Sequence, residues 1–246
     1  MPFRIFNTEE VAQYLNLPTT DIERMVKDRE IPFEVRGDRT VFRRPEIDAW
    51  ASQRILGLSA SRLAEYHKKW AQQSTEMLGR ETLVSELLHP DYIDAAMTAK
   101  TKASIIRDMV ALADGTGQVY DSAELVQSLE AREELCSTAL PGGVAFLHPR
   151  SMQPYRFDCS FIALGCTVQQ IHFGSPDGQP TDLFFLVCCQ DEKLHLHTLA
   201  RLCLMAQKTD ILAQLRAAED AVQLYDSMCG SEQAVLSKLQ RNPSSP

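Results

Sequence analysis

Residues 181–189 constrain the fold of this chain more than any other stretch. They read T-D-L-F-F-L-V-C-C, a continuous apolar run of the kind that forms a strand buried on both faces. Two more strands are predicted at about 143–148 and 158–167, and helical patterns cover 102–113 and 122–134. Because these strands alternate with helices, we expect an α/β fold in which a mixed sheet carries helices on both faces.

A single histidine ends the most distinctive of these segments. Residues 132–150 read R-E-E-L-C-S-T-A-L-P-G-G-V-A-F-L-H-P-R. The Pro-Gly-Gly of 141–143 predicts a turn, and the apolar run 144–147 predicts a short strand bounded by proline. We therefore expect His148 at the end of a buried strand, held by rigid backbone on both sides.

A second pair of histidines follows the run 181–189. Apolar residues at helical spacing predict a helix that starts near Leu194, with His195 and His197 in its first turn. Ligand sites of open α/β sheets collect at such strand ends. Residues two apart on a helix diverge by about 200°, so only one of the two imidazoles can face His148, and no metal site is predicted.

Residues from about 85 to 236 resemble the enzyme IIA domains of the bacterial sugar phosphotransferase system, of the fructose/mannitol type. The nitrogen-regulatory subgroup is the most similar. Three ordered segments carry the resemblance: 132–148, then I-H-F-G-S-P-D-G-Q-P-T-D-L-F-F-L at 171–186, and H-L-H-T-L-A-R-L at 195–202 followed by 216–225. Three matches at family-like separations are far more specific than one.

The resemblance implies a phosphohistidine carrier without a cofactor. His148 falls on the family's phosphoryl acceptor, which receives its phosphoryl group from a small histidine phosphocarrier protein. His195 falls on the supporting histidine, and Ser137 and Thr138 fall on the family's Ser-Thr pair. A neutral imidazole is a good nucleophile near pH 7, and phosphoryl transfer needs mainly positioning and charge stabilisation.

The sequence also departs from the family pattern around this histidine. Cys136 replaces a glycine, Leu147 replaces the proline before the histidine, and Pro149 replaces the glycine after it. Proline removes a backbone donor and fixes φ, so the phosphoryl cradle or the docking of a partner can change. The alternative function is therefore a degenerate enzyme IIA-like protein that binds a partner without being phosphorylated.

Residues 1–54 form a separate unit. The pattern is helix, short turn, helix, hairpin, helix, which is a winged helix-turn-helix layout. It resembles the excisionase-type domains through a shared set of residues: Thr8, Glu10, Ala12, Tyr14, Leu15, Ile31, Pro32, Arg44, Ile47 and Trp50.

In that family the second helix enters the DNA major groove. The candidate DNA-binding residues are those on this helix and on the wing: Thr19, Thr20, Arg24, Lys27, Arg36, Arg39 and Arg43. Phosphate contacts need cations, yet residues 1–54 hold nine Lys and Arg against ten Asp and Glu. DNA binding and protein binding therefore both stay open for this domain.

A long connecting helix is expected between the two units, over 56–80. Leu63, Tyr66, Trp70 and Met77 follow a heptad-like spacing, which fits either a homodimer helix or packing on the chain's own C-terminal domain. The expected domains are the helix-turn-helix (1–54), the connecting helix (55–82), the enzyme IIA-like domain (83–237) and a mobile tail (238–246).

Composition limits the other function classes. The 246 residues carry a net charge of −8, which argues against indiscriminate nucleic-acid binding. No basic, apolar N-terminal signal and no apolar run of about 20 residues is present, so we expect a cytoplasmic protein without a membrane anchor. Walker loops, Gly-x-Gly-x-x-Gly turns and zinc-ligand spacings are also missing.

Overall fold

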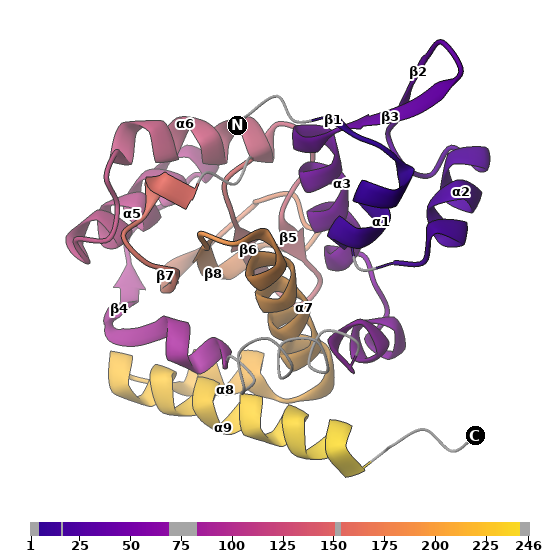
Figure 1. Ribbon diagram of the computed structural model, residues 1–246. Helices are drawn as coiled ribbons and strands as arrows, with labels where there is room; N and C mark the ends of the chain where they lie inside the picture. The colour runs from indigo at the N-terminus through magenta and orange to yellow at the C-terminus, as the bar shows by residue number, and fades with distance from the viewer. Residues whose placement is uncertain (1–4, 16, 69–82, 151–153, 242–246) are drawn as a thin grey trace.

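The computed structural model describes residues 5–15, 17–68, 83–150 and 154–241 (Figure 1). The N-terminal unit contains β1 (Ile5–Phe6), α1 (Thr8–Leu15), α2 (Thr19–Lys27), β2 (Glu34–Arg36), β3 (Arg39–Arg43) and α3 (Arg44–Leu56). The C-terminal unit contains η1 (Val84–Leu87), β4 (Leu88–Met97), α5 (Lys102–Gly115), α6 (Ser122–Glu133), β5 (Ala139–Leu140), β6 (Val144–Leu147), η2 (Pro154–Arg156), β7 (Phe161–Ile171), β8 (Thr181–Cys188), α7 (Glu192–Lys208), α8 (Ile211–Ala217) and α9 (Ala221–Arg241).

The N-terminal unit is the expected winged helix-turn-helix. Its strands pair antiparallel in the order β1-β3-β2, and β2 and β3 form the wing. The start of α1 is capped reciprocally: Asn7 Oδ1 accepts from the Glu10 N–H at 2.8 Å, and Glu10 Oε2 accepts from the Asn7 N–H at 2.9 Å. Ile22, Phe42 and Ile47 are completely buried and form its core.

The C-terminal unit is built on a five-stranded mixed sheet in the order β4-β7-β8-β6-β5. β4 runs parallel to β7, β8 lies antiparallel to β7, and β6 runs parallel to β8. The predicted strands at 143–148, 158–167 and 181–189 are β6, β7 and β8. β4 was not predicted, because Leu88–Met97 mixes polar residues and a proline into its apolar positions, as edge strands commonly do.

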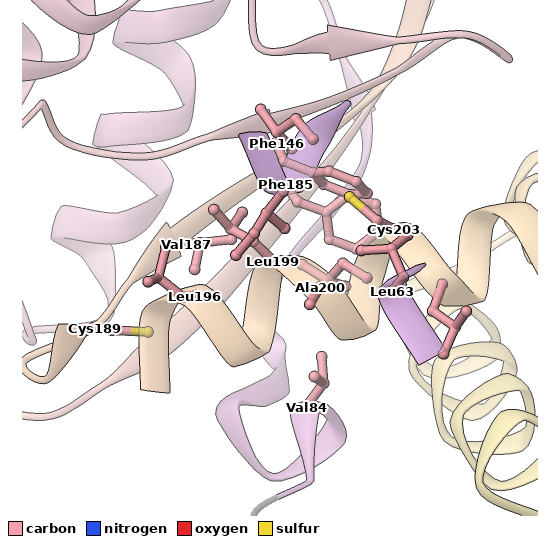
Figure 2. Packing of buried hydrophobic residues seen from close by; sticks show 14 of the residues in the cluster. Leu63, Val84, Phe146, Phe185, Val187, Cys189, Leu196, Leu199, Ala200 and Cys203 are labelled. Carbon is pink, nitrogen blue, oxygen red and sulfur yellow. The ribbon is translucent and has the colours of Figure 1, made fainter. Parts of the chain in front are cut away.

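Helices cover both faces of this sheet, which confirms the predicted fold class. In Figure 1, α5 and α6 lie on one side of the sheet, and α7, α8 and α9 lie on the other. Phe146, Phe185 and Val187 point from the sheet toward α7, where Leu199 and Cys203 meet them (Figure 2). The opposite face packs on α5 and α6 through residues such as Ile105 and Leu129.

The connecting helix differs from the expectation. α3 ends at Leu56, and a new helix begins at residue 60, so the predicted single helix over 56–80 is interrupted at its start. The break arises where the Gly57 N–H caps α3 by donating to the Gln53 carbonyl at 3.2 Å. Leu63 is fully buried within the chain, whereas Trp70 and Met77 lie outside the described residues. Homodimer formation therefore stays a prediction.

One further boundary shifts. α9 continues to Arg241, so residues 238–241 of the predicted tail are helical, and 242–246 lie outside the described residues. Within the described ranges, no helix combines the length and the apolar character that crossing a bilayer needs.

The two units share one core. α3 packs against α7, and the buried apolar residues of the helix-turn-helix join those on the α7 face of the sheet in a single continuous cluster. This contact sets the surroundings of the histidines predicted above.

Candidate functional site

His148 lies where the sequence predicted, immediately after β6. Parallel pairing with β8 holds that strand through the register Leu147↔Leu186. The turn before β6 depends on glycine: Gly143 has φ +79°, and a Cβ there would lie 2.6 Å from Nη2 of Arg216 and 3.1 Å from Oδ1 of Asp182. The Pro-Gly-Gly turn therefore fixes where β6 starts and, through it, the position of His148 directly after the strand.

Two hydrogen bonds define the protonation of the His148 ring. Nδ1 lies 2.9 Å from the carbonyl oxygen of Phe146, which only accepts, so Nδ1 carries the proton. Nε2 accepts a hydrogen bond from Nε of Arg132 at 3.0 Å and therefore presents a lone pair. Burial, followed by the charges of Arg132 and His195, holds the pKa of His148 well below its usual 6.5. The ring is thus neutral and nucleophilic at Nε2.

His195 lies beside it, from the other strand end. The side chain of Asp191 caps α7 by accepting from the Leu194 N–H at 2.9 Å, which places His195 in the first turn. The ring centroids of His148 and His195 are 5.1 Å apart. Burial and then the Arg132 guanidinium lower the pKa of His195 to about 3.

The His197 side chain leaves α7 in a different direction from that of His195, as the helical geometry required. It is fully buried, and its ring lies 5.0 Å from that of His67 in the helix of residues 60–68. Nε2 of His197 also lies 3.3 Å from Nη2 of Arg201, which forms an ion pair with the buried Glu232. This cluster ties the connecting segment to α7 and α9 and stays apart from His148.

Arg132 is a third site residue, one that was not predicted from the sequence. Arg132 is 1% exposed, and its guanidinium bonds to His148 and to the carbonyl and sulfur of Cys136. Nη2 has no hydrogen-bond partner among the described residues. The signal was present, because Leu125, Leu129 and Arg132 follow the 3-4 spacing of one helix face. A charged residue on a buried stripe usually has a functional or paired role.

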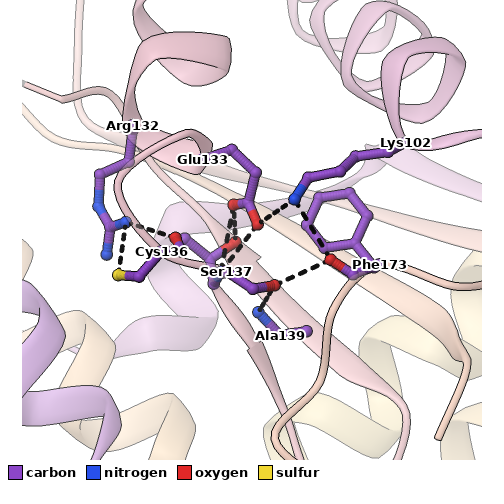
Figure 3. Close-up of polar contacts among 8 residues, drawn as sticks. Lys102, Arg132, Glu133, Cys136, Ser137, Ala139 and Phe173 are labelled. Atoms are coloured by element: carbon purple, nitrogen blue, oxygen red, sulfur yellow. Dashed lines mark hydrogen bonds and ion pairs between the residues drawn. The ribbon is translucent and has the colours of Figure 1, made fainter. Parts of the chain in front are cut away.

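Ser137 and Thr138 follow Cys136 in the corner next to this arginine, and Figure 3 shows the polar contacts of Ser137 and Glu133 there. The Ser137 hydroxyl donates to the Phe173 carbonyl at 3.0 Å, and the Thr138 hydroxyl donates to Oε2 of Glu133 at 2.7 Å. Glu133 also accepts from the Thr138 N–H at 3.1 Å and pairs with Nζ of Lys102 at 3.0 Å. These hydroxyl bonds run to Glu133 and Phe173 rather than to His148, so the pair shapes the loop that holds Arg132.

Helix α3 of the N-terminal unit lies over the two imidazoles. Ser52 is 3% exposed, and its hydroxyl lies 3.3 Å from Nε2 of His195. One turn earlier, Asp48 accepts from the Tyr14 hydroxyl at 2.5 Å, and burial raises the pKa of this carboxyl to about 6. Arg44, a further turn back, forms an ion pair with Glu192 at the start of α7. As a result His148 is only 1% exposed.

The candidate DNA-binding residues lie on α2 and the wing, and Arg24 also lines a cavity with Arg62 and Leu196. Figure 1 shows α2 on the outer side of this unit, away from the sheet. Thr19 is partly exposed, and the other six candidates are exposed. Glu34 pairs with both Arg36 and Arg43, so one negative charge is shared between two of the three wing cations.

Paired imidazoles at the strand ends of a helix-covered mixed sheet, joined to a helix-turn-helix, define a two-domain protein with a histidine site in its α/β half. This chain belongs to the family described as "Phosphoenolpyruvate-dependent sugar phosphotransferase system, EIIA 2", which matches residues 86–228. A helix-turn-helix domain family of the excisionase-like kind matches residues 5–63.

Relatives of the C-terminal unit support this assignment. A nitrogen regulatory protein of Bradyrhizobium diazoefficiens is 32% identical over 145 residues, which cover 58% of this chain and 92% of that protein. The fructose-specific EIIABC component of Bacillus subtilis is 28% identical over 145 residues, and the match spans only 22% of that longer protein.

Solved structures share the fold. The nitrogen regulatory protein IIA-Ntr of Neisseria meningitidis superposes with a TM-score of 0.55 at 24% identity, over 60% of this chain and 99% of that one. The mannitol IIA of Escherichia coli gives 0.50 at 17% identity, over 57% of this chain and 97% of that one. These similarities cover the α/β unit.

Proposed function

We propose that this chain is a regulator whose EIIA domain accepts a phosphoryl group on Nε2 of His148. The main support is the hydrogen bond between Nδ1 of His148 and the Phe146 carbonyl. It keeps the proton on Nδ1, so that Nε2 carries an unprotonated lone pair, which accepts from Arg132 in the structure, and needs no base to activate it.

The donor in this proposal is the phosphorylated histidine phosphocarrier protein of the phosphotransferase system. The Nε2 lone pair of His148 attacks phosphorus, the N–P bond of the donor breaks, and the donor imidazole leaves with the bonding electrons. No proton has to leave His148 in this step. Arg132 releases Nε2 and offers its guanidinium to the transferred oxygens, including Nη2, which no described residue binds, while His195 stabilises the group from the side.

The helix-turn-helix suggests what the phosphoryl group controls. Several relatives are named nitrogen regulatory proteins, and we propose a related role in the cytoplasm, where a phosphorylation state reaches DNA through α2 and the wing. The outward position of these elements supports DNA contact, and the balanced charge of residues 1–54 indicates modest affinity.

A second candidate function is supported by the covered site. Leu147 and Pro149 flank His148, and α3 buries it, as expected if the histidine were a structural remnant and the domain bound a protein partner without phosphorylation. In that case the helix-turn-helix and the EIIA domain would form one fixed interaction module.

One labelling experiment separates the two. The full chain is incubated to completion with phosphoenolpyruvate and the two general phosphotransferase proteins, and acid-labile phosphate is counted per chain. We expect incorporation that is absent from His148→Ala and reduced about tenfold or more in initial rate in Arg132→Gln. A wild-type chain that stays unlabelled at the endpoint, beside a labelled ordinary EIIA, would establish the non-phosphorylated module instead.

A further inference from the structure

A polar stripe on α3 fills the surface in front of the phosphoryl acceptor. Arg44, Asp48 and Ser52 are four residues apart and therefore share one helix face. Two of them have partners in the EIIA unit: Arg44 pairs with Glu192, and the Ser52 hydroxyl lies 3.3 Å from Nε2 of His195. Asp48 accepts from Tyr14 of its own unit, and both line the small cavity beside His148. This face of the helix-turn-helix unit is thus matched to the EIIA site at its two ends.

The space left under α3 is too small for a phosphoryl group. The cavity lined by Ala49, Ser52, Arg132, His148 and His195 has a volume of about 10 Å³. That volume holds at most one water molecule. A phosphoryl group adds a phosphorus atom and three oxygens to Nε2, and the donor histidine has to approach in line behind it. Transfer to His148 therefore requires α3 to move away.

We propose that α3 occupies, within the chain, the same docking surface that the phosphocarrier protein needs, so that the two compete for it. This inference rests on the proposed phosphorylation of His148. While α3 is docked, His148 is shielded and α2 and the wing face outward. Once His148 is phosphorylated, the added group fills the space where α3 packed, and the helix-turn-helix stays released until the phosphoryl group leaves.

The apolar part of the contact between α3 and the EIIA domain determines when the opened form is favoured. Leu196, one residue after His195, is 5% exposed and belongs to the cluster that includes Leu56 and Leu63. Opening exposes this apolar surface to water, at a cost that grows with its area. A docked phosphocarrier would cover the same surface, so the opened form is favoured when the donor is present and not in its absence.

Two substitutions on α3 should open the site without changing the EIIA residues. Arg44→Glu turns the ion pair with Glu192 into a repulsion. Ala49→Trp places a large side chain into the 10 Å³ cavity, and Ala49 is outside the buried core of the helix-turn-helix. The matched control is Arg107→Glu, an identical charge reversal on the exposed face of α5. Circular dichroism and thermal unfolding establish that all four proteins are folded.

The first measurement is chemical access and does not depend on phosphorylation. Diethyl pyrocarbonate modifies accessible neutral imidazoles, and peptide mass mapping gives the rate at His148. We expect a slow rate in the wild type and in Arg107→Glu, and a rate roughly tenfold higher or more in Arg44→Glu and Ala49→Trp. Equal rates at His148 in all four proteins would overturn the α3 contact, whatever happens to phosphate.

The second measurement is the initial rate of phosphoryl transfer from the phosphocarrier to the same four proteins. We expect the two opened variants to accept phosphate roughly tenfold faster or more than the wild type and the control. Equal transfer rates, with changed chemical access, would overturn the competition. No phosphate on any of the four, with chemical access changed as expected, would overturn the phosphoryl-acceptor function and leave the α3 contact standing.

Discussion

At the residue scale, the site depends on keeping two imidazoles neutral next to a buried cation. Arg132 donates to Nε2 of His148, and both histidines have pKa values below the usual one because of burial and this guanidinium. The sequence predicted that His148 and His195 would meet, since each follows a strand of one sheet. The sequence could not predict how Arg132 would bind His148, because the geometry of a hydrogen bond leaves no pattern in the sequence.

The lowered pKa of His195 predicts a pH dependence of stability. The unfolded imidazole takes up a proton below about pH 6.5, and the folded one only near pH 3, so the unfolded state binds more protons between these values. The folded state should therefore lose stability as the pH falls, by about 1–2 kcal/mol between pH 6.5 and 5 from this group. Urea unfolding by circular dichroism at several pH values measures this loss.

The variant His195→Gln should show a shallower loss, equivalent to about one proton fewer taken up on unfolding. His89→Gln, which removes an exposed imidazole on β4, is the matched control. If His195→Gln and the wild type lost stability in parallel over this range, His195 would not be held neutral in the folded protein.

At the element scale, the corner after α6 carries the site. The sequence predicted the helix and the strand on either side of this corner. The hydrogen bonds inside the corner are made by Glu133, an acidic residue in a charged helical stretch that is equally typical of a solvated surface. In the structure Glu133 is 6% exposed and accepts hydrogen bonds from the backbone N–H and the hydroxyl of Thr138. Glu133 is buried because it has partners, such as Lys102, that are distant from it in the sequence.

Glu133→Ala should therefore destabilise the chain by about 2–3 kcal/mol, because the N–H and hydroxyl of Thr138 would be left buried without partners. Its neighbour provides the control: Glu134 is exposed, and Glu134→Ala should change the free energy of unfolding by less than about 0.5 kcal/mol. Denaturant midpoints compare the two directly. Similar midpoints for both variants would show that the corner does not depend on Glu133.

At the scale of the whole molecule, the sequence indicated two domains but not how they meet. The stripe of Arg44, Asp48 and Ser52 is polar, and polar residues at helical spacing normally form a solvated face. Here that face covers the histidine site instead, because Glu192, Tyr14 and His195 supply partners that no local pattern reveals. Both families were predictable; the interface was not.

This arrangement leaves α2 and the wing free, which predicts a measurable interaction with DNA. We expect weak binding of duplex DNA that falls with rising salt, and in Arg39→Ala the slope of log affinity against log salt should decrease by about one. Arg107→Ala, on α5, is the control and should keep the wild-type slope. Absent or salt-insensitive binding by the wild type would favour a protein partner for the wing.

The continuous core that joins the helix-turn-helix to the α7 face has an evolutionary consequence. Domains joined only by a linker can be exchanged between proteins, whereas here each half completes the hydrophobic interior of the other. A substitution on the inner side of α3 has to be matched on α7, so the two helices should co-vary among proteins that share this fusion. Chimeras that combine either half with its counterpart from an unfused protein should aggregate, and the fusion is best understood as one inherited unit.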